Sequence, residues 1–207
     1  MLSKGDTYSE AQEPAHAEFK DAHNLVLAAL AKSGGGEVFV LDGPAAKSTL
    51  ALLKAGVPRS RVRVANRHGA TLGAIRGLTA LPAAQLAGAA AAEALRPGGA
   101  FGDVAFSALY LDACGQSPGP LVDMIEAAFD REAMPARVAL GFSLLGGGQD
   151  VADREMAVVR AAATAGRKHG MVVRHVGDEP GEFGVVLENK VHDGTLTCWL
   201  CLDKVVC

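Results

Sequence analysis

An apolar stretch that changes abruptly into a helical pattern constrains the fold of this chain more than any other segment. Residues 37–41 read Glu-Val-Phe-Val-Leu, Asp42-Gly43-Pro44 follows at once, and a helical pattern occupies about 46–55. This order is typical of α/β proteins, in which a buried parallel strand ends in a tight turn and the next helix directs its free N–H groups at a ligand. The stretch therefore predicts a parallel sheet with a ligand site at its edge.

The rest of the chain continues the alternation of strands and helices. After the first strand, further strands are predicted at 61–65, within 78–85, at 105–111 and at 137–144, and helices at 70–77, 86–95, 120–129 and 150–168. A helix with apolar positions between Ala17 and Leu30 precedes the first strand, and Gly34 ends it. Alternation of this kind predicts a parallel sheet with helices on both faces.

The C-terminal part has a different pattern. Three apolar runs at 171–176, 183–190 and 195–206 follow one another without a helix, and Asp193-Gly194 is a hairpin turn signal between the last two. Consecutive strands predict an antiparallel addition at one edge of the sheet. We expect residues 1–36 to form an N-terminal helical segment packed on the domain, and residues 37–207 to form the domain.

Composition excludes several classes of protein. A chain of 207 residues fits one domain with a sizeable core, and its net charge of -3 argues against a strongly basic nucleic-acid binder. The longest apolar tract, 78–95, is broken by Pro82, Gln85, Gly88 and Glu93, so no membrane span is expected. Because no secretory signal or disulfide framework is visible, we expect an intracellular protein, most readily a cytoplasmic one.

Lys47-Ser48 resembles the end of a phosphate-binding loop. The pattern G-x-x-x-x-G-K-[ST] requires two glycines, but this chain has Leu41 and Ala46 at those positions. The glycines let successive backbone N–H groups wrap around the phosphates. A degenerate NTP-binding enzyme is therefore kept as an alternative interpretation.

The order of elements and the strand ends resemble class I S-adenosylmethionine-dependent methyltransferases over about 37–206. The resemblance is carried by the loop 41–45 after the first strand, Asn66 after the second, Asp112 after the fourth, and the hairpin at 183–206. It implies a Rossmann-like three-layer α/β sandwich, with a seven-stranded, mostly parallel sheet and an antiparallel hairpin at the C-terminal edge. Only Gly43 of the family's glycine pattern is present, so a catalytically inactive methyltransferase-like binding protein is a second alternative.

The resemblance also implies a cofactor, S-adenosylmethionine, and a set of residues that bind it. Asp42 would lie beside the amino-acid or ribose part, Asn66 beside the ribose, and Gln85, in the loop after the third strand, beside the adenine. Asp112 would line the catalytic mouth and orient or deprotonate the methyl acceptor. The resemblance does not identify the methyl acceptor, and both nucleic acid and protein are kept as candidates. The implied cofactor-binding residues are Asp42, Gly43, Pro44, Ala45, Asn66, Gln85 and Asp112.

Both acidic residues also have a structural interpretation, as caps of the turn or helix that follows each strand. His68 and His175 are further proton-transfer candidates, although a surface position is the simpler interpretation of each. Cys114 is expected to be a partly buried thiol.

No metal site is predicted from the remaining histidines and cysteines. His16 and His23 are expected on a solvated helix face. Cys198 and Cys201 form a C-x-x-C, but residues three apart in a strand point to opposite faces. Arg59, Arg61 and Arg63 alternate with valines, and this pattern favours a solvent-facing strand side over a phosphate-binding row.

Overall fold

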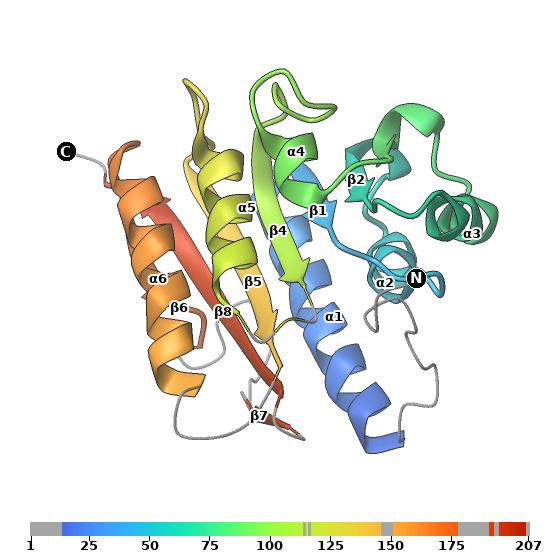
Figure 1. Cartoon of the computed structure of the whole chain (residues 1–207), viewed down its shortest axis with the longest axis horizontal. Helices are drawn as coiled ribbons and strands as arrows, with labels where there is room; N and C mark the ends of the chain where they lie inside the picture. Colours follow the sequence, from blue (N-terminus) through green and yellow to red (C-terminus); the bar gives the residue numbers. More distant parts are fainter. Residues whose placement is uncertain are drawn as a thin grey trace, which may run out of the picture.

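The computed structural model describes residues 14–113, 115, 117–145, 151–177, 191–192 and 195–205. Strands and helices alternate through most of this range, and the helices cover both faces of one sheet (Figure 1). The elements in chain order are α1 (Pro14–Gly34), β1 (Glu37–Val40), α2 (Lys47–Lys54), η1 (Arg59–Arg61), β2 (Val62–Ala65), α3 (Gly69–Thr79), η2 (Ala83–Gln85), β3 (Leu86–Ala87), α4 (Ala91–Leu95), β4 (Phe106–Asp112), α5 (Gly119–Phe129), β5 (Arg137–Leu144), α6 (Val151–Arg167), β6 (Met171–His175), β7 (Val191–His192) and β8 (Thr195–Lys204).

The sheet has the strand order β3-β2-β1-β4-β5-β8-β6, with β7 pairing to β8 as well. The strands from β3 to β5 pair in parallel, whereas β8 is antiparallel to both of its long neighbours, β5 and β6. The predicted Rossmann-like sheet with an antiparallel hairpin is thus confirmed. The antiparallel strand lies one place inside the edge, and β6 forms the edge itself. Strand order reverses between β1 and β4, which is where ligands bind in open α/β sheets.

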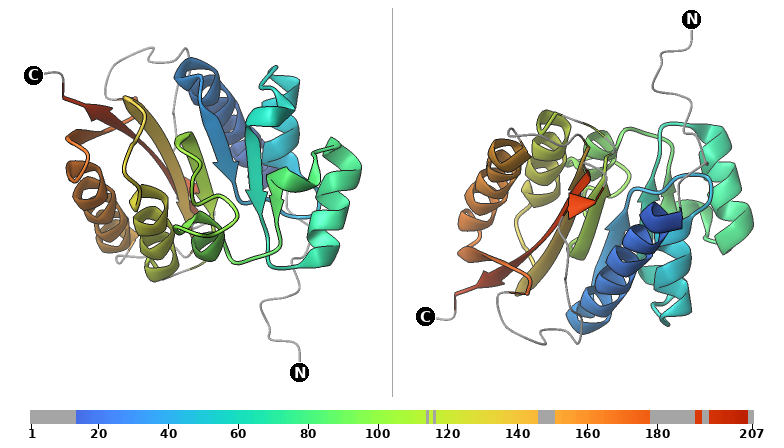
Figure 2. Two further views of the ribbon diagram at one scale, coloured as in Figure 1. Left: turned by 90° about the horizontal axis from the view of Figure 1, so that it is seen from above. Right: turned by 90° about the horizontal axis from the view of Figure 1, so that it is seen from below.

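Each face of the sheet carries its own hydrophobic core. Phe39 of β1 belongs to a cluster with residues of α4, α5 and α6, while its neighbours Val38 and Val40 belong to a cluster with residues of α1, α2 and α3. Figure 2 shows the two helical layers on either side of the sheet. Cys198 and Cys201 are divided in the same way between the two clusters, so the prediction that their thiols diverge is confirmed.

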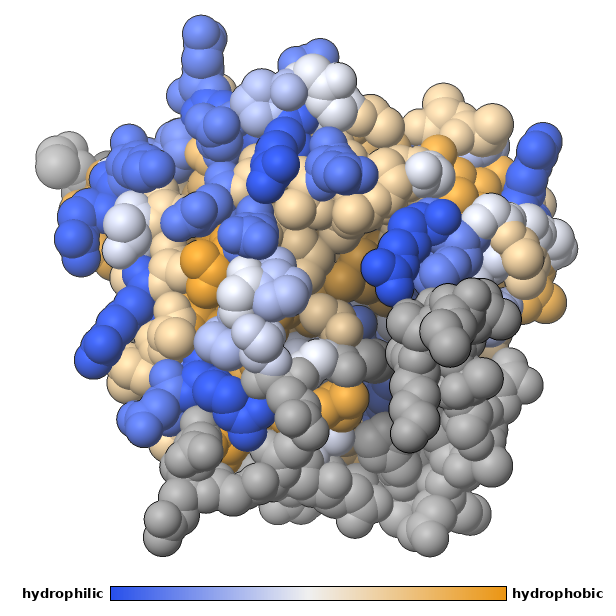
Figure 3. All heavy atoms as spheres, viewed as in Figure 1, coloured by the Kyte–Doolittle hydropathy of each residue, from blue (hydrophilic) through white to orange (hydrophobic). Residues whose placement is uncertain are grey.

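The helices are amphipathic, so their outward faces carry hydrophilic side chains. On the face shown in Figure 3, hydrophilic side chains cover much of the region of α5 and α6. Among the described residues, no helix has the combination of length and hydrophobicity that a bilayer crossing needs.

The predicted third strand within 78–85 is wrong. Helix α3 continues to Thr79, whose hydroxyl donates to the Ile75 carbonyl, and Ala80 then ends the helix in a left-handed conformation. The short 3-10 turn η2 follows Pro82, so β3 begins only at Leu86. The helix predicted at 86–95 shrinks to α4 for the same reason, since β3 occupies its first residues. The strand predicted at 183–190 lies outside the described residues.

His23 does not lie on a solvated helix face, as was predicted. It shares the buried face of α1 with Leu27 and Leu30, and it is 3% exposed. The indole N–H of Trp199 donates to its Nδ1 at 3.0 Å. Burial lowers the pKa of His23 to about 4, and the opposing attraction of Asp112 is weaker. His23 is therefore a neutral acceptor at neutral pH.

Arg59, Arg61 and Arg63 were expected on a solvent-facing side of a strand, but their guanidinium groups donate to backbone carbonyls. Arg61 donates to the carbonyls of Gly36 at 2.6 Å and Ala31 at 2.8 Å, which joins the end of α1 to the start of β1. Arg59 donates to the Thr79 carbonyl at 2.9 Å. These contacts lie near the amino ends of β1 and β2, so they tie helices to the sheet.

Replacing Gly141 with alanine is expected to destabilise the fold by about 1–3 kcal/mol, because overpacking a filled core has costs of this size. A Cβ atom at this position of β5 would lie 2.5 Å from ring carbons of the buried Trp199. Urea denaturation measures the effect. The control is Gly73→Ala in α3, where a Cβ would meet nothing within 4 Å. That change should stabilise by roughly 0.5–1 kcal/mol through helix propensity. Equal stabilities for the two variants would contradict the tight fit around Gly141.

Candidate functional site

A cavity of about 1390 Å³ opens at the carboxyl ends of β1, β2 and β4. Its walls are the β1–α2 loop, the β2–α3 loop with one residue of α3, residues 89–92 after β3, the end of β4, two residues of α1, and three residues of α5 that include Asp123. This is the place where the strand order reverses, and it coincides with the ligand position expected for the fold.

Most of the predicted site residues line this cavity, and one does not. The lining includes Asp42, Gly43, Pro44, Ala45, Asn66 and Asp112. Gln85 was expected after the third strand, but it lies in η2, directly before β3. Its side chain is buried, and its Oε1 has no hydrogen-bond partner among the described residues. The expected position of Gln85 is therefore wrong, and the structure does not bring it to the cavity.

Asp42 caps the helix that follows it. One carboxylate oxygen accepts the Thr49 N–H at 2.8 Å, and the other accepts the Ser48 N–H at 3.4 Å. Burial raises the pKa of Asp42 from its ordinary value of 3.8 to about 6, and these N–H bonds offset part of that rise. Both carboxylate oxygens of Asp42 therefore cap the helix, as the structural interpretation predicts. The residue also borders the cavity.

This cap argues against a phosphate-binding loop. The N–H groups at the start of α2 that would bind a phosphate are already bonded to a carboxylate, which would repel a second anion. Ala46, the residue before α2, has a φ of 51° in the left-handed region. Glycine adopts this conformation without strain, whereas alanine does so at a cost of roughly 1–2 kcal/mol. The backbone here is one that a glycine-rich loop would use, although the glycine is absent.

Asn66 joins two loops of the cavity. Its Nδ2 donates to the backbone carbonyl of Asp42 at 3.1 Å, and its Oδ1 accepts the His68 N–H at 2.8 Å. A carboxylate at this position could not make the first of these bonds, because it has no hydrogen to donate. The arrangement gives a physical reason for an amide side chain at this position.

Asp112 forms an ion pair across the cavity wall. Lys20 of α1 reaches its Oδ2 with an Nζ–Oδ2 distance of 3.0 Å, and the two side chains are only 17% and 15% exposed. Asn24 lies one helical turn after Lys20 and lines the same cavity. Its Oδ1 is buried and has no hydrogen-bond partner among the described residues.

The contribution of α1 to this site was not predicted from the sequence. Lys20 and Asn24 are spaced i, i+4, on the side of the helix that continues to the buried Leu27 and Ala31. Two polar residues in line with an apolar stripe were the available signal, since such residues face the domain and need a partner there.

The other candidates are separated. His68 lines the cavity with an exposed side chain, whereas His175 lies beside Cys198, with 3.5 Å between Nδ1 and Sγ. Cys114 lies outside the described residues.

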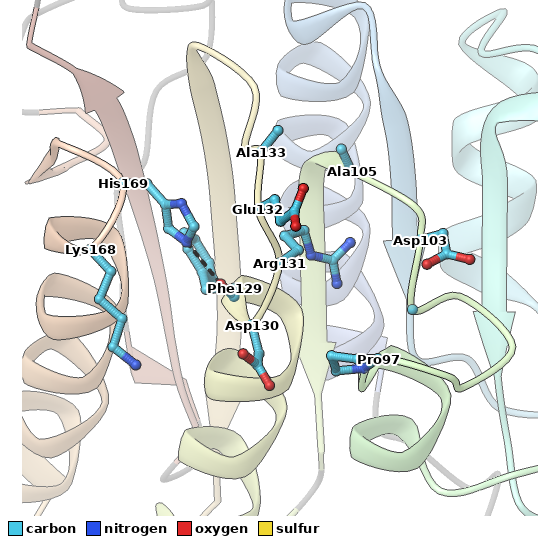
Figure 4. Close-up of a pocket in the computed structure, with 11 residues that line it drawn as sticks. Pro97, Asp103, Ala105, Phe129, Asp130, Arg131, Glu132, Ala133, Lys168 and His169 are labelled. Atoms are coloured by element: carbon cyan, nitrogen blue, oxygen red, sulfur yellow. Dashed lines mark hydrogen bonds between the residues drawn. The ribbon is translucent and has the colours of Figure 1, made fainter.

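A second cavity, of about 730 Å³, lies near the amino ends of β4 and β5. Figure 4 shows charged side chains from three segments around it, including Asp103, Arg131 and Lys168. Arg131 lies 5.6 Å from the ring centre of Phe106, and burial lowers its pKa. This edge is opposite the carboxyl ends of the strands, so we place the candidate active site in the first cavity.

Comparisons with known proteins bear on the fold of this chain. The sequence matches no family model and no curated protein. Among solved structures, the chain is similar to the O-methyltransferase from Bacillus cereus in complex with SAH, with a TM-score of 0.58, 11% identity, and coverage of 93% of this chain and 82% of that one. It is also similar to the N-methyltransferase NodS from Bradyrhizobium japonicum, with a TM-score of 0.52, 10% identity, and coverage of 94% and 100%. For M. jannaschii TYW2 in complex with AdoMet the values are 0.50, 11%, 94% and 78%. The expected resemblance is thereby confirmed as a shared fold.

Proposed function

We propose that this protein transfers a methyl group from S-adenosylmethionine to an acceptor that is still unidentified. The observation that carries the proposal is the cavity at the reversal of strand order, where Asp42, Asn66 and Asp112 come together from β1, β2 and β4. Its volume of about 1390 Å³ exceeds the roughly 300–1,000 Å³ typical of small-molecule sites, which leaves room for an acceptor beside the cofactor.

The residues of the cavity fit the chemistry of this cofactor. S-adenosylmethionine carries a positive sulfonium and an ammonium group, and it has hydroxyl and amine donors on its adenosine part. The cavity offers the carboxylates of Asp42, Asp112 and Asp123 to the cationic groups. The buried Oδ1 of Asn24 is an acceptor that still needs a donor, and a bound ligand would supply one.

Different residues would hold different parts of the cofactor. The Gly43–Ala45 loop lets a ligand approach the backbone closely, since a Cβ at Gly43 would meet nothing within 4 Å. Lys20 supplies a positive charge for the carboxylate of the methionine part, and Asp42 a negative charge for its ammonium. When bound, the cofactor supplies an electrophilic methyl group on its sulfonium.

Asp112 is placed to act on the acceptor. Methyl transfer is an in-line displacement, so the protein mainly has to hold the acceptor on the axis of the reacting bond. Lys20 fixes the Asp112 carboxylate at the end of β4, where it can accept a hydrogen bond or a proton from the acceptor.

Calorimetric titration with S-adenosylmethionine, S-adenosylhomocysteine, and ATP with magnesium tests the proposal. We expect binding of the first two ligands and no heat from ATP, because Asp42 already occupies the N–H groups that a phosphate would use. Binding of ATP alone would contradict the proposal and restore the NTP-binding interpretation. No binding of any ligand would favour a methyltransferase-like protein without this activity.

Replacing Asn24 with alanine separates ligand binding from stability. The change removes a buried acceptor that has no hydrogen-bond partner in the part of the chain that the structure describes, so the free energy of unfolding should stay within about 1 kcal/mol of the wild type. The affinity for S-adenosylmethionine should fall roughly tenfold if the acceptor bonds the ligand. Ser33→Ala, on the exposed end of the same helix, is the control and should change neither quantity by much. An unchanged affinity of the Asn24 variant would remove this residue from the site.

A further inference from the structure

Three potential metal ligands lie together near β8 and the edge strand β6, away from the cavity between β1 and β4. Glu155 of α6, His175 of β6 and Cys198 of β8 each offer one ligand atom, and these atoms all lie within 4.8 Å of one another. Cys198 is fully buried, and the other two side chains are half-buried. The three residues come from different elements, so no motif in the sequence links them.

We infer that this cluster is a binding site for a zinc-like divalent transition metal. Thiolate, imidazole and carboxylate are the ligand types that zinc prefers in proteins. The Cys198 Sγ and the His175 Nδ1 are 3.5 Å apart. In a tetrahedral site with Zn–S near 2.3 Å and Zn–N near 2.0–2.1 Å, the same two atoms would be about 3.5 Å apart. The pair therefore already has the separation that a shared ion requires, and rotation of the longer Glu155 side chain completes the third contact.

Burial favours a metal site over a nucleophilic cysteine. A thiol that attacks a substrate must be reachable by it, and Cys198 is 0% exposed. A metal ion needs only a path past the half-buried Glu155 and His175. On binding, the ion takes the place of the thiol proton, which is released. Three protein ligands leave the fourth tetrahedral position to water or to an external ligand.

The proposed site is separate from the cavity at the carboxyl ends of β1, β2 and β4. It uses Cys198 but not Cys201, the other cysteine of the C-x-x-C. Strand β5 lies between β4, which carries Asp112, and β8, which carries Cys198. Cys201 is in the same strand as Cys198, but it packs into the core on the opposite face. It offers a matched control, since it has the same chemistry, the same strand and equal burial without the cluster.

Titration of the reduced, untagged full-length protein with Co²⁺ tests the site, because a thiolate ligand gives a sulfur-to-cobalt charge-transfer absorption. We expect this absorption in the wild type and in Cys201→Ser, and its loss in Cys198→Ser. Displacement by Zn²⁺ should remove the absorption and leave about one bound metal ion per chain. Absorption that persists in Cys198→Ser, or that is lost equally in both variants, would overturn the inference.

Variants of the two half-buried ligands keep the test valid if a core serine prevents folding. His175→Gln and Glu155→Gln retain similar volumes, and each should weaken zinc binding by tenfold or more. Zinc should also raise the melting temperature of the wild type and have a smaller effect on these variants. The same thermal shift in all three proteins would contradict a site made of these residues.

Discussion

Replacing Trp199 with alanine is expected to lower the free energy of unfolding by about 3–5 kcal/mol, the range for large aromatic residues in a core. The indole is 1% exposed and stacks on Tyr110, with ring centres 5.2 Å apart. Its N–H is the donor to the buried Nδ1 of His23. The substitution therefore leaves a large cavity and removes a hydrogen bond from an acceptor that water does not reach.

Trp199→Phe divides this loss into two parts. Phenylalanine keeps most of the stacked ring but has no N–H, so we expect a smaller loss that includes about 1–3 kcal/mol for the unpaired His23 nitrogen. Chemical denaturation followed by far-ultraviolet circular dichroism measures all three proteins, because the only tryptophan of the chain is removed. Equal stability of the wild type and the phenylalanine variant would show that the His23 bond contributes nothing.

Replacing Asp42 with asparagine is expected to make the stability of the protein strongly pH-dependent. Two buried groups titrate in overlapping ranges with opposite effects, because the pKa of Asp42 is raised to about 6 and the pKa of His23 is lowered to about 4. Each shift corresponds to about 3 kcal/mol, at about 1.4 kcal/mol for one pKa unit. In the wild type the two effects largely cancel.

The directions follow from the protons bound in each state. Folded Asp42 holds its proton up to about pH 6, so the stability it contributes is present below about pH 4 and is lost as pH rises through about 6. Unfolded His23 takes up a proton below about 6.5, whereas folded His23 does so only near pH 4, so its effect is a loss of stability as pH falls through this window. Asp112 acts electrostatically on both groups, and it raises the pKa of each.

Denaturation at several pH values between about 4 and 7 measures the difference between the variants. Asp42→Asn should gain about 3 kcal/mol over this range as pH rises, since only the His23 effect remains. His23→Gln, whose amide can still accept the Trp199 N–H, should lose a similar amount over the same range. Parallel curves for the wild type and Asp42→Asn would show that the Asp42 carboxyl titrates normally in the folded protein.

The sheet could be predicted from the sequence because its signals are local. The apolar run at 137–144 coincides with β5 (Arg137–Leu144), and the Asp42 turn marks the end of β1 as expected. The two-residue strand β3 could not be found in this way, because it has too few residues to show a period. Because β3 was predicted too early in the chain, Gln85 was expected after this strand, whereas it lies directly before it.

The residues predicted at the strand ends line the cavity, whereas the residues of α1 that line its other wall were not predicted. Asp42 and Asn66 follow strands and Asp112 ends one, so the fold places them together. Lys20 and Asn24 precede the sheet in the chain, and only the packing of α1 on the sheet brings them to the site. The same holds for His23, whose partner Trp199 is 176 residues away. The spacing of Lys20 and Asn24 indicates that they face the domain, but no local pattern in the sequence identifies the distant residues that they meet there.

The position of β8 has a consequence for the order in which the protein can fold. Among the described strands, the edge strand β6 pairs only with β8, which is the last of them to leave the ribosome. Until then β5 also has an unpaired edge, because β8 pairs with it along Arg137–Leu144. A nascent chain that stops before Thr195 would therefore present two open strand edges, a known hazard for aggregation. The half with the reversal of strand order can assemble early, whereas the half with Glu155, His175 and Cys198 is complete only once β8 has joined the sheet.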